Sequence, residues 1–167
     1  MKQIAFVCLG CSKNLVDGEK MLAQLAEAGC VVGAPMDQAD VIVINTCGFL
    51  AAARDESHDY IAEALAVKAK RENVRVVVAG CLPSRDGEDI YHQADGVDAI
   101  VGVNDREAIV EAVLGDGIIT RLSEYPAAAS IPAASDSGRF RLTDQHTAYL
   151  RIAEGCSQKC TFCTIPV

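Results

Sequence analysis

Three cysteines near the carboxyl end of the chain could hold an iron–sulfur cluster. Cys156, Cys160 and Cys163, here called the loop triad, follow the pattern C-x3-C-x2-C, with the aromatic Phe162 directly before the last of them. Iron–sulfur clusters are held by cysteine thiolates, usually four of them. Three thiolates would leave one iron of a four-iron cluster without a protein ligand, and that iron could bind and activate a substrate. The alternatives are a structural zinc loop, which usually pairs C-x2-C units or adds histidines, and a disulfide framework.

Three other cysteines, here called the strand-end triad, each follow a predicted buried strand and stand beside a glycine. They are Cys11, Cys47 and Cys81. Ligands of open parallel sheets bind outside the carboxyl ends of the strands, so we expect these thiols to converge on one crevice. The glycines would let the backbone approach a bulky inorganic group, and helix N-termini after the turns would favour thiolates. A second three-thiolate site is therefore predicted; the alternative is three buried structural cysteines.

Cys8 and Cys30 fall outside this pattern, because they stand at the end of the first predicted strand and the start of the second. We expect both to pack in the core, as free cysteines often do. Cys8 is close enough to Cys11 in the sequence to be a spare ligand.

The elements that would position the strand-end triad alternate between strand and helix. Strands are predicted at residues 3–8, 30–33, 41–44, 74–79 and 99–101, and helical patterns include residues 51–71 and 84–94. Such alternation predicts an α/β fold with a doubly wound, mainly parallel five-stranded sheet. In the flavodoxin-like order 2-1-3-4-5, strands 1, 3 and 4 are neighbours, which brings the three thiols together. Asn104, with Glu107 three residues later, predicts a cap for a last helix.

The composition changes after this unit. We assign residues 1–122 to a cluster-binding domain and the Ala-, Pro- and Ser-rich residues 123–147 to a linker. Residues 148–167 would begin a second domain, with a strand-like pattern from Ala148 to Ile152. A parallel barrel needs about 200 residues or more, so the sequence is expected to be a fragment of a longer protein.

Composition limits the other classes of function. The chain has 167 residues, 50% of them hydrophobic, eight cysteines and a formal net charge of −8. Long Val, Ile and Ala runs favour reduced thiols in the cytoplasm over a secreted disulfide scaffold. Leu9-Gly10-Cys11 is similar to a lipoprotein cleavage site, but the apolar run before it is too short, and no stretch reaches transmembrane length. The negative charge disfavours direct binding of nucleic acid.

The two triads, in this order, resemble the methylthiotransferases of the radical S-adenosylmethionine (SAM) class, and the resemblance covers nearly the whole chain. Residues 9–17 (LGCSKNLVD), 45–49 (NTCGF) and 148–156 (AYLRIAEGC) look like the RimO branch. The tRNA-modifying, MiaB-like branch typically has Gln-Met in place of Ser12-Lys13. Departures are small: Gly18 stands where the family often has Ser, and the linker is unusually rich in Ala.

This resemblance implies methylthiolation of the β-carbon of an aspartate in ribosomal protein S-twelve of the small subunit. It implies two 4Fe-4S clusters, one on each triad. The loop-triad cluster would cleave SAM to a radical that abstracts hydrogen, with the backbone near Phe162 approaching the SAM adenine. The strand-end cluster would carry the sulfur, and a second SAM would supply the methyl group. An electron donor and a sulfur source are the further partners implied, and no membrane is involved.

Two other functions remain open at this point. One keeps the chemistry but makes a tRNA adenosine the substrate. The other is a noncatalytic metal or electron-transfer module with one structural site. We also expect residues 1–167 alone to lack turnover, because most of the SAM pocket and a C-terminal TRAM domain would lie beyond them.

Overall fold

The computed structural model describes residues 1–71, 73–123, 138–151 and 161. The predicted loop triad (Cys156, Cys160 and Cys163) and Phe162 lie outside the described residues, so the expectations for them stay predictions.

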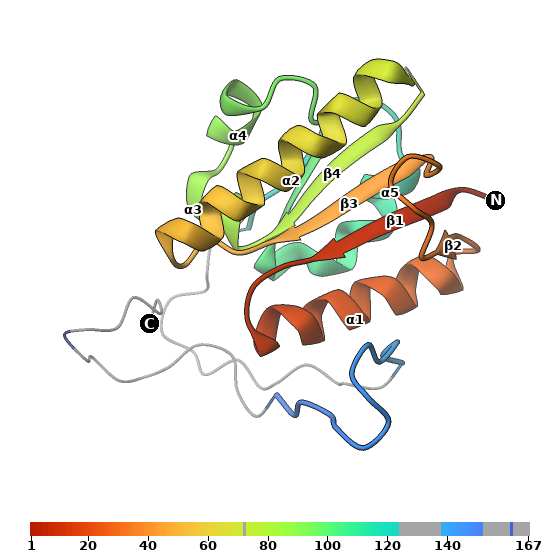
Figure 1. Ribbon diagram of the computed structural model, residues 1–167, viewed down its shortest axis with the longest axis vertical. Coiled ribbons are helices and arrows are strands. Elements are labelled where there is room, and N and C mark those ends of the chain that lie inside the picture. Colours follow the sequence, from red (N-terminus) through yellow and green to blue (C-terminus); the bar gives the residue numbers. More distant parts are fainter. Residues whose placement is uncertain (72, 124–137, 152–160, 162–167) are drawn as a thin grey trace.

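One parallel sheet organises the described chain (Figure 1). Its strands lie in the order β2-β1-β3-β4-β5-β6, and every neighbouring pair is parallel. Their bounds are β1 Gln3–Cys8, β2 Val31–Val32, β3 Val41–Thr46, β4 Arg75–Gly80, β5 Ala99–Gly102 and β6 Ile119–Arg121. The central strands are long runs of Val and Ile because both of their faces are buried. The predicted α/β class with a doubly wound parallel sheet is thus confirmed.

Helices cover both faces of the sheet (Figure 1). On one face lie α1 (Ser12–Glu27) and α5 (Ile109–Leu114), which pack on the core that contains Val41 and Val43. On the other lie α2 (Ala51–Lys70), α3 (Cys81–Asp86) and α4 (Asp89–Gln93), which pack on the core that contains Ile42 and Ile44. Successive strand residues serve opposite cores because side chains alternate across a strand.

Three details differ from the sequence prediction. The sheet has six strands, because the three-residue β6 pairs with β5 at the edge, too short and too exposed to give a periodic signal. The helix predicted over 84–94 is divided into α3 and α4 around Gly87, whose φ is 61°. The cap at Asn104 is wrong: the short 3-10 helix η1 (Val103–Ala108) precedes α5, and the Asn104 amide donates to the Ser123 carbonyl.

Residues 138–151 run along α1 without regular secondary structure, and the strand predicted to start at Ala148 does not form over 148–151. Arg151 is the buried residue of this stretch, and its guanidinium lies against Asp17 of α1. Among the described residues, no helix is both long enough and apolar enough to cross a bilayer.

Candidate functional site

The strand-end triad lies at the carboxyl edge of the sheet, on three adjacent strands. Cys11 precedes the first residue of α1 after β1, Cys47 directly follows β3, and Cys81 begins α3 after β4. The strands end nearly level, because Cys8 is in register with Asn45 and Thr46 with Gly80. The loops that carry the three thiols therefore leave the same edge side by side.

Close backbone approaches draw the three loops together at two glycines. A Cβ atom at Gly10 would lie 2.9 Å from the Cβ of Cys47 and 3.2 Å from its Sγ. A Cβ atom at Gly48 would lie 2.7 Å from the carbonyl oxygen of Cys81. Real Cβ atoms are not found this close to other atoms, so both positions depend on glycine. The loop after β1 thus contacts Cys47, and the loop after β3 contacts Cys81.

Two asparagines tie the first loop to β3. The side-chain amide of Asn14 donates to the carbonyls of Leu9, at 2.6 Å, and Thr46, at 3.1 Å. The side-chain amide of Asn45 donates back to the Asn14 carbonyl at 2.9 Å. Asn14 and Asn45 are buried, so their amide N–H groups need such acceptors in place of water.

Other polar side chains fix the remaining two loops. The backbone amide of Cys47 donates to Ser57 Oγ of α2 at 3.2 Å. The Thr46 hydroxyl donates to the Ala79 carbonyl of β4 at 2.6 Å, and Arg85 of α3 donates to the Gly48 carbonyl at 2.9 Å. The sequence analysis missed all of these residues. Their only signal is a polar type beside a strand end or on a buried helix face, which does not identify a partner.

Burial raises the pKa of the Cys81 thiol above its ordinary value, and nearby Lys13 opposes the shift with its positive charge. Cys47 and Cys11 also act on this thiol electrostatically, which places all three sulfurs in one neighbourhood. The helix N-terminus was expected to stabilise the thiolate and so to lower the pKa of Cys81. The pKa is raised instead.

The other two described cysteines differ from the triad. Cys30 is buried in the core, as predicted. Cys8 is only partly buried, and its sulfur accepts a hydrogen bond from the Asn45 amide at 3.6 Å. Burial also raises the pKa of Cys8, with the Asn45 bond opposing the shift. All five described cysteines are free thiols, which does not support a disulfide framework among them.

A shallow cavity of about 190 Å³ opens beside Cys11. Its lining comes from the end of β1, the loop after it, the start of α1 and one distant residue: Cys8, Leu9, Gly10, Cys11, Ser12, Leu15 and Tyr149. Cys11 is exposed, whereas Cys47 is buried and Cys81 partly buried. The accessible side of the triad is therefore the side of Cys11.

Three thiols at one sheet edge are donors of the type that iron–sulfur clusters use. Sulfurs around one tetrahedral zinc lie about 3.8 Å apart, since each metal–sulfur distance is about 2.3 Å. Among the described residues, no group of three or more His, Cys, Asp or Glu side chains is placed to hold a metal ion. A four-iron cluster takes one thiolate per iron, so its ligands stand further apart. At Gly10 and Gly48 a side chain would overlap Cys47 and Cys81, so glycine lets the cysteine loops pack against one another.

Comparison with known proteins gives two results. The pattern of the family described as uncharacterized protein family UPF0004 matches residues 3–102. The chain is also similar to curated proteins named ribosomal protein uS12 methylthiotransferase RimO. It is 41% identical over 165 residues to the one from Symbiobacterium thermophilum, which is 99% of this chain and 34% of that protein. The one from Alteromonas mediterranea is 44% identical over 164 residues, with 98% and 31% covered. The chain thus spans about a third of the length of these relatives.

A Gly10→Ala substitution should be more destabilising than the same change at Gly33. Both glycines have φ of 93°, but a Cβ at Gly33 would meet nothing within 4 Å, whereas one at Gly10 would meet Cys47. Strain at positive φ costs about 1–3 kcal/mol at either position, and the overlap with Cys47 adds roughly 1–3 kcal/mol at Gly10 alone. Urea denaturation would measure both free energies of unfolding. Equal losses would show that the approach of Gly10 to Cys47 is not a constraint.

Alkylation of Cys81 should follow a pH profile displaced upward from that of an ordinary thiol. Its raised pKa leaves less reactive thiolate at a given pH, so the midpoint should lie above that of the same cysteine in urea-unfolded chain. Lys13→Gln should move the midpoint further up, because it removes the positive charge that opposes the shift. Mass spectrometry after timed iodoacetamide treatment of the metal-free protein gives both midpoints. A folded midpoint at or below the unfolded one would contradict the effect of burial.

Proposed function

The chain belongs to the uncharacterized protein family UPF0004, and from this premise we propose that it takes part in methylthiolation of an aspartate in ribosomal protein uS12. In the proposed reaction, a C–H bond on the aspartate β-carbon is replaced by C–S–CH3. The convergence of Cys11, Cys47 and Cys81 at one sheet edge is the observation that carries the proposal. Three thiols at one edge would form the three-thiolate site that is expected in the first domain of the methylthiotransferases that the sequence resembles. The names of the relatives supply the substrate class.

Two groups would be needed, and each triad has the donor chemistry for one. Cys156, Cys160 and Cys163 would hold one 4Fe-4S cluster, and Cys11, Cys47 and Cys81 would hold the other. When bound, these groups would supply an electron to cleave SAM and a sulfur for the new bond, and a second SAM would supply the methyl group. The need for a radical follows from the target, because an unactivated C–H bond has no acidic proton that a side-chain base could remove.

The chain's own residues would contribute placement and access. Ser57, Thr46 and Arg85 hold the loops of Cys47 and Cys81 against α2, β4 and α3. Cys11 lies on the exposed side, so a group held by the triad would be approached from the cavity that Cys11 lines. Lys13 would offset part of the negative charge that the thiolates bring to this edge. Phe162 would place its backbone near the SAM adenine.

The remaining parts of the proposal concern partners. The reaction would take place in the cytoplasm on uS12 or the small ribosomal subunit, with an electron donor and a sulfur source. A tRNA adenosine is the second candidate substrate. The net charge of −8 does not favour contact between this part of the protein and a phosphate backbone. A noncatalytic electron-transfer module is the third candidate, and it would need only one cluster.

Anaerobic reconstitution tests the two cluster sites. The purified protein should bind about eight irons per chain, and Cys47→Ala should lose about half of them, because each four-iron cluster depends on its own triad. Cys160→Ala should lose the other half. Cys30→Ala is the matched control. Cys30 is buried beside the start of β1, away from the carboxyl ends of the strands, so the iron content of this variant should equal that of the wild type. A colourless protein loaded with zinc would end the proposal.

The substrate is tested in a strain that lacks the gene. Mass spectrometry of uS12 should show that the methylthio group on its aspartate is lost, while methylthio-nucleosides in digested tRNA are retained. The full-length gene with Cys30→Ala should restore the modification, and the gene with Cys11→Ala should not. Loss of a methylthio-nucleoside with an unchanged uS12 would instead support the tRNA substrate.

A further inference from the structure

Two carboxylates of α1 are buried, in a helix with few exposed residues. Asp17 is 2% exposed and Glu19 is 1% exposed. Ionised carboxylates are rarely buried unless they are paired, because removal from water costs more than most contacts return. Their two positions differ by about 200° around the helix, so they face different neighbours. Each should therefore have a specific cationic partner.

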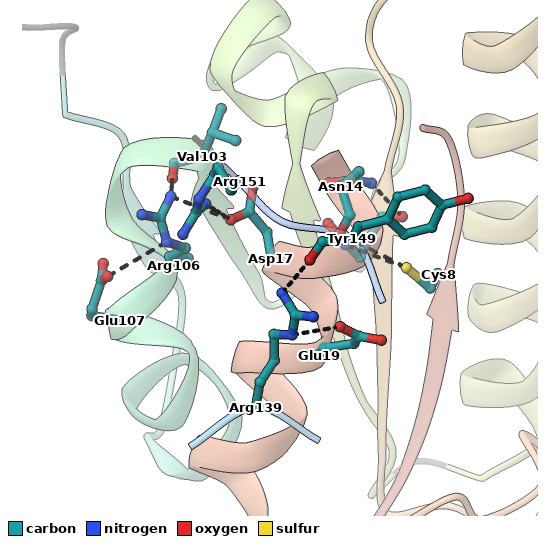
Figure 2. A network of polar contacts seen from close by, with 11 residues as sticks. Cys8, Asn14, Asp17, Glu19, Val103, Arg106, Glu107, Arg139, Tyr149 and Arg151 are labelled. Atoms are coloured by element: carbon teal, nitrogen blue, oxygen red, sulfur yellow. Dashed lines mark hydrogen bonds and ion pairs between the residues drawn. The ribbon is translucent and has the colours of Figure 1, made fainter. Parts of the chain in front are cut away.

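The partners come largely from a distant part of the chain (Figure 2). Arg151 Nη1 lies 2.5 Å from Asp17 Oδ1, across 134 residues of sequence. Arg139 Nε lies 2.9 Å from Glu19 Oε2. Asp17 is shared with Arg106 of η1, whose Nη1 is 3.5 Å from the same oxygen. One carboxylate thus joins the first domain to the chain that follows it, and the second adds an independent attachment.

Backbone groups of the same segment strengthen the attachment at Glu19. The Leu142 amide donates to Glu19 Oε1 at 2.6 Å, and the Phe140 amide donates to the Glu19 carbonyl at 3.0 Å. The large apolar side chains of the segment, Phe140, Leu142, Tyr149 and Leu150, are exposed. Residues 138–151 have no regular secondary structure, and Arg151 is their only fully buried member. Apolar burial therefore cannot be the main force that places this segment on α1.

The attachment has a consequence at the cysteine edge. Arg139 also donates to the Tyr149 carbonyl at 3.0 Å, and Arg151 follows Tyr149 by two residues. Tyr149 thus accepts a hydrogen bond at its own carbonyl and lies two residues from the Arg151 ion pair. It lines the cavity beside Cys8 and Cys11. From Arg151 the chain has only five residues to reach Cys156, a span of at most about 18 Å.

We propose that Asp17 and Glu19 are positioning residues that clasp residues 138–151 onto α1. The clasp consists of Asp17 with Arg151 and Glu19 with Arg139. It places Tyr149 at the cavity beside Cys11 and fixes the point from which the chain continues to the loop triad. By fixing this point, the clasp would also limit the distance between the two cysteine triads. That role rests on the function proposed above, whereas the attachment of residues 138–151 to α1 does not depend on it. Nothing in it requires a bound cluster.

Hydrogen exchange in the full-length, cluster-free protein tests the clasp. The variants change the segment rather than the first domain, so that the sheet can fold in each. In Arg139→Gln/Arg151→Gln, exchange at the Phe140 and Leu142 amides should rise about tenfold or more, because both charged attachments are lost. Amides of β3 and β4 should exchange as in the wild type. Arg141→Gln is the matched control: Arg141 is exposed, donates to the Gln145 carbonyl, and should change neither region.

A conservative pair separates charge from mere side-chain volume. Arg139→Lys/Arg151→Lys keeps both positive charges with fewer donors, so its exchange should fall between those of the wild type and the Gln pair. Wild-type exchange in the Gln pair would overturn the proposal. So would an equal rise in β3 and β4, which would make the arginines general stabilisers of the domain. Because no cluster is involved, either failure would leave the proposed methylthiolation untouched.

Discussion

The candidate site depends on the parallel register of β1, β3 and β4. Each strand is fixed to its neighbour by main-chain hydrogen bonds in a region that water does not reach, where unpaired backbone groups are costly. A shift of one residue would move a loop by about 3.3 Å and turn the strand's side chains toward the opposite core. The cores on the two faces, which contain Val41 and Val43 on one side and Ile42 and Ile44 on the other, oppose such a shift. The cysteines inherit their common edge from this packing.

The parts of the fold that the sequence predicts well are those with local signals. Val41-Ile42-Val43-Ile44 is an unbroken run of β-branched residues, which predicts a buried strand, and it lies within β3. Placing a cysteine after each of three strands needed only the alternation of elements and the rule that parallel strands end at one edge. The strand-end arrangement was therefore predictable, although no two of Cys11, Cys47 and Cys81 are close in the sequence. The loop triad is the opposite case, because its spacing is local but its surroundings are not described.

The parts that the sequence did not predict depend on distant partners. The cap expected at Asn104 failed because Asn104 lies inside the 3-10 helix η1, and α5 begins only at Ile109. In the sequence, Asn14 has the pattern of an ordinary polar helix residue. In the structure its side chain donates to the carbonyl of Leu9, in the loop after β1, and to that of Thr46, the last residue of β3. Asp17 and Glu19 would be assigned to a solvated helix face, and only the position of residues 138–151 shows why they are buried. Such contacts carry no periodic signal.

The same charged residues distinguish the thiols at this edge. Burial raises the pKa of both Cys8 and Cys81, but only Cys81 has a positive charge nearby that opposes the shift. Cys8 faces Glu19 and Asp17, whose negative charges raise its pKa further, whereas Lys13 lowers that of Cys81. A metal ligand must be a thiolate. The carboxylates that clasp the following segment therefore make Cys8 the less suitable ligand, although it is nearest to Cys11 in sequence and shares its cavity. The neighbouring charges thus distinguish Cys81 from Cys8, whereas Cys11, Cys47 and Cys81 are related by their positions at three adjacent strand ends.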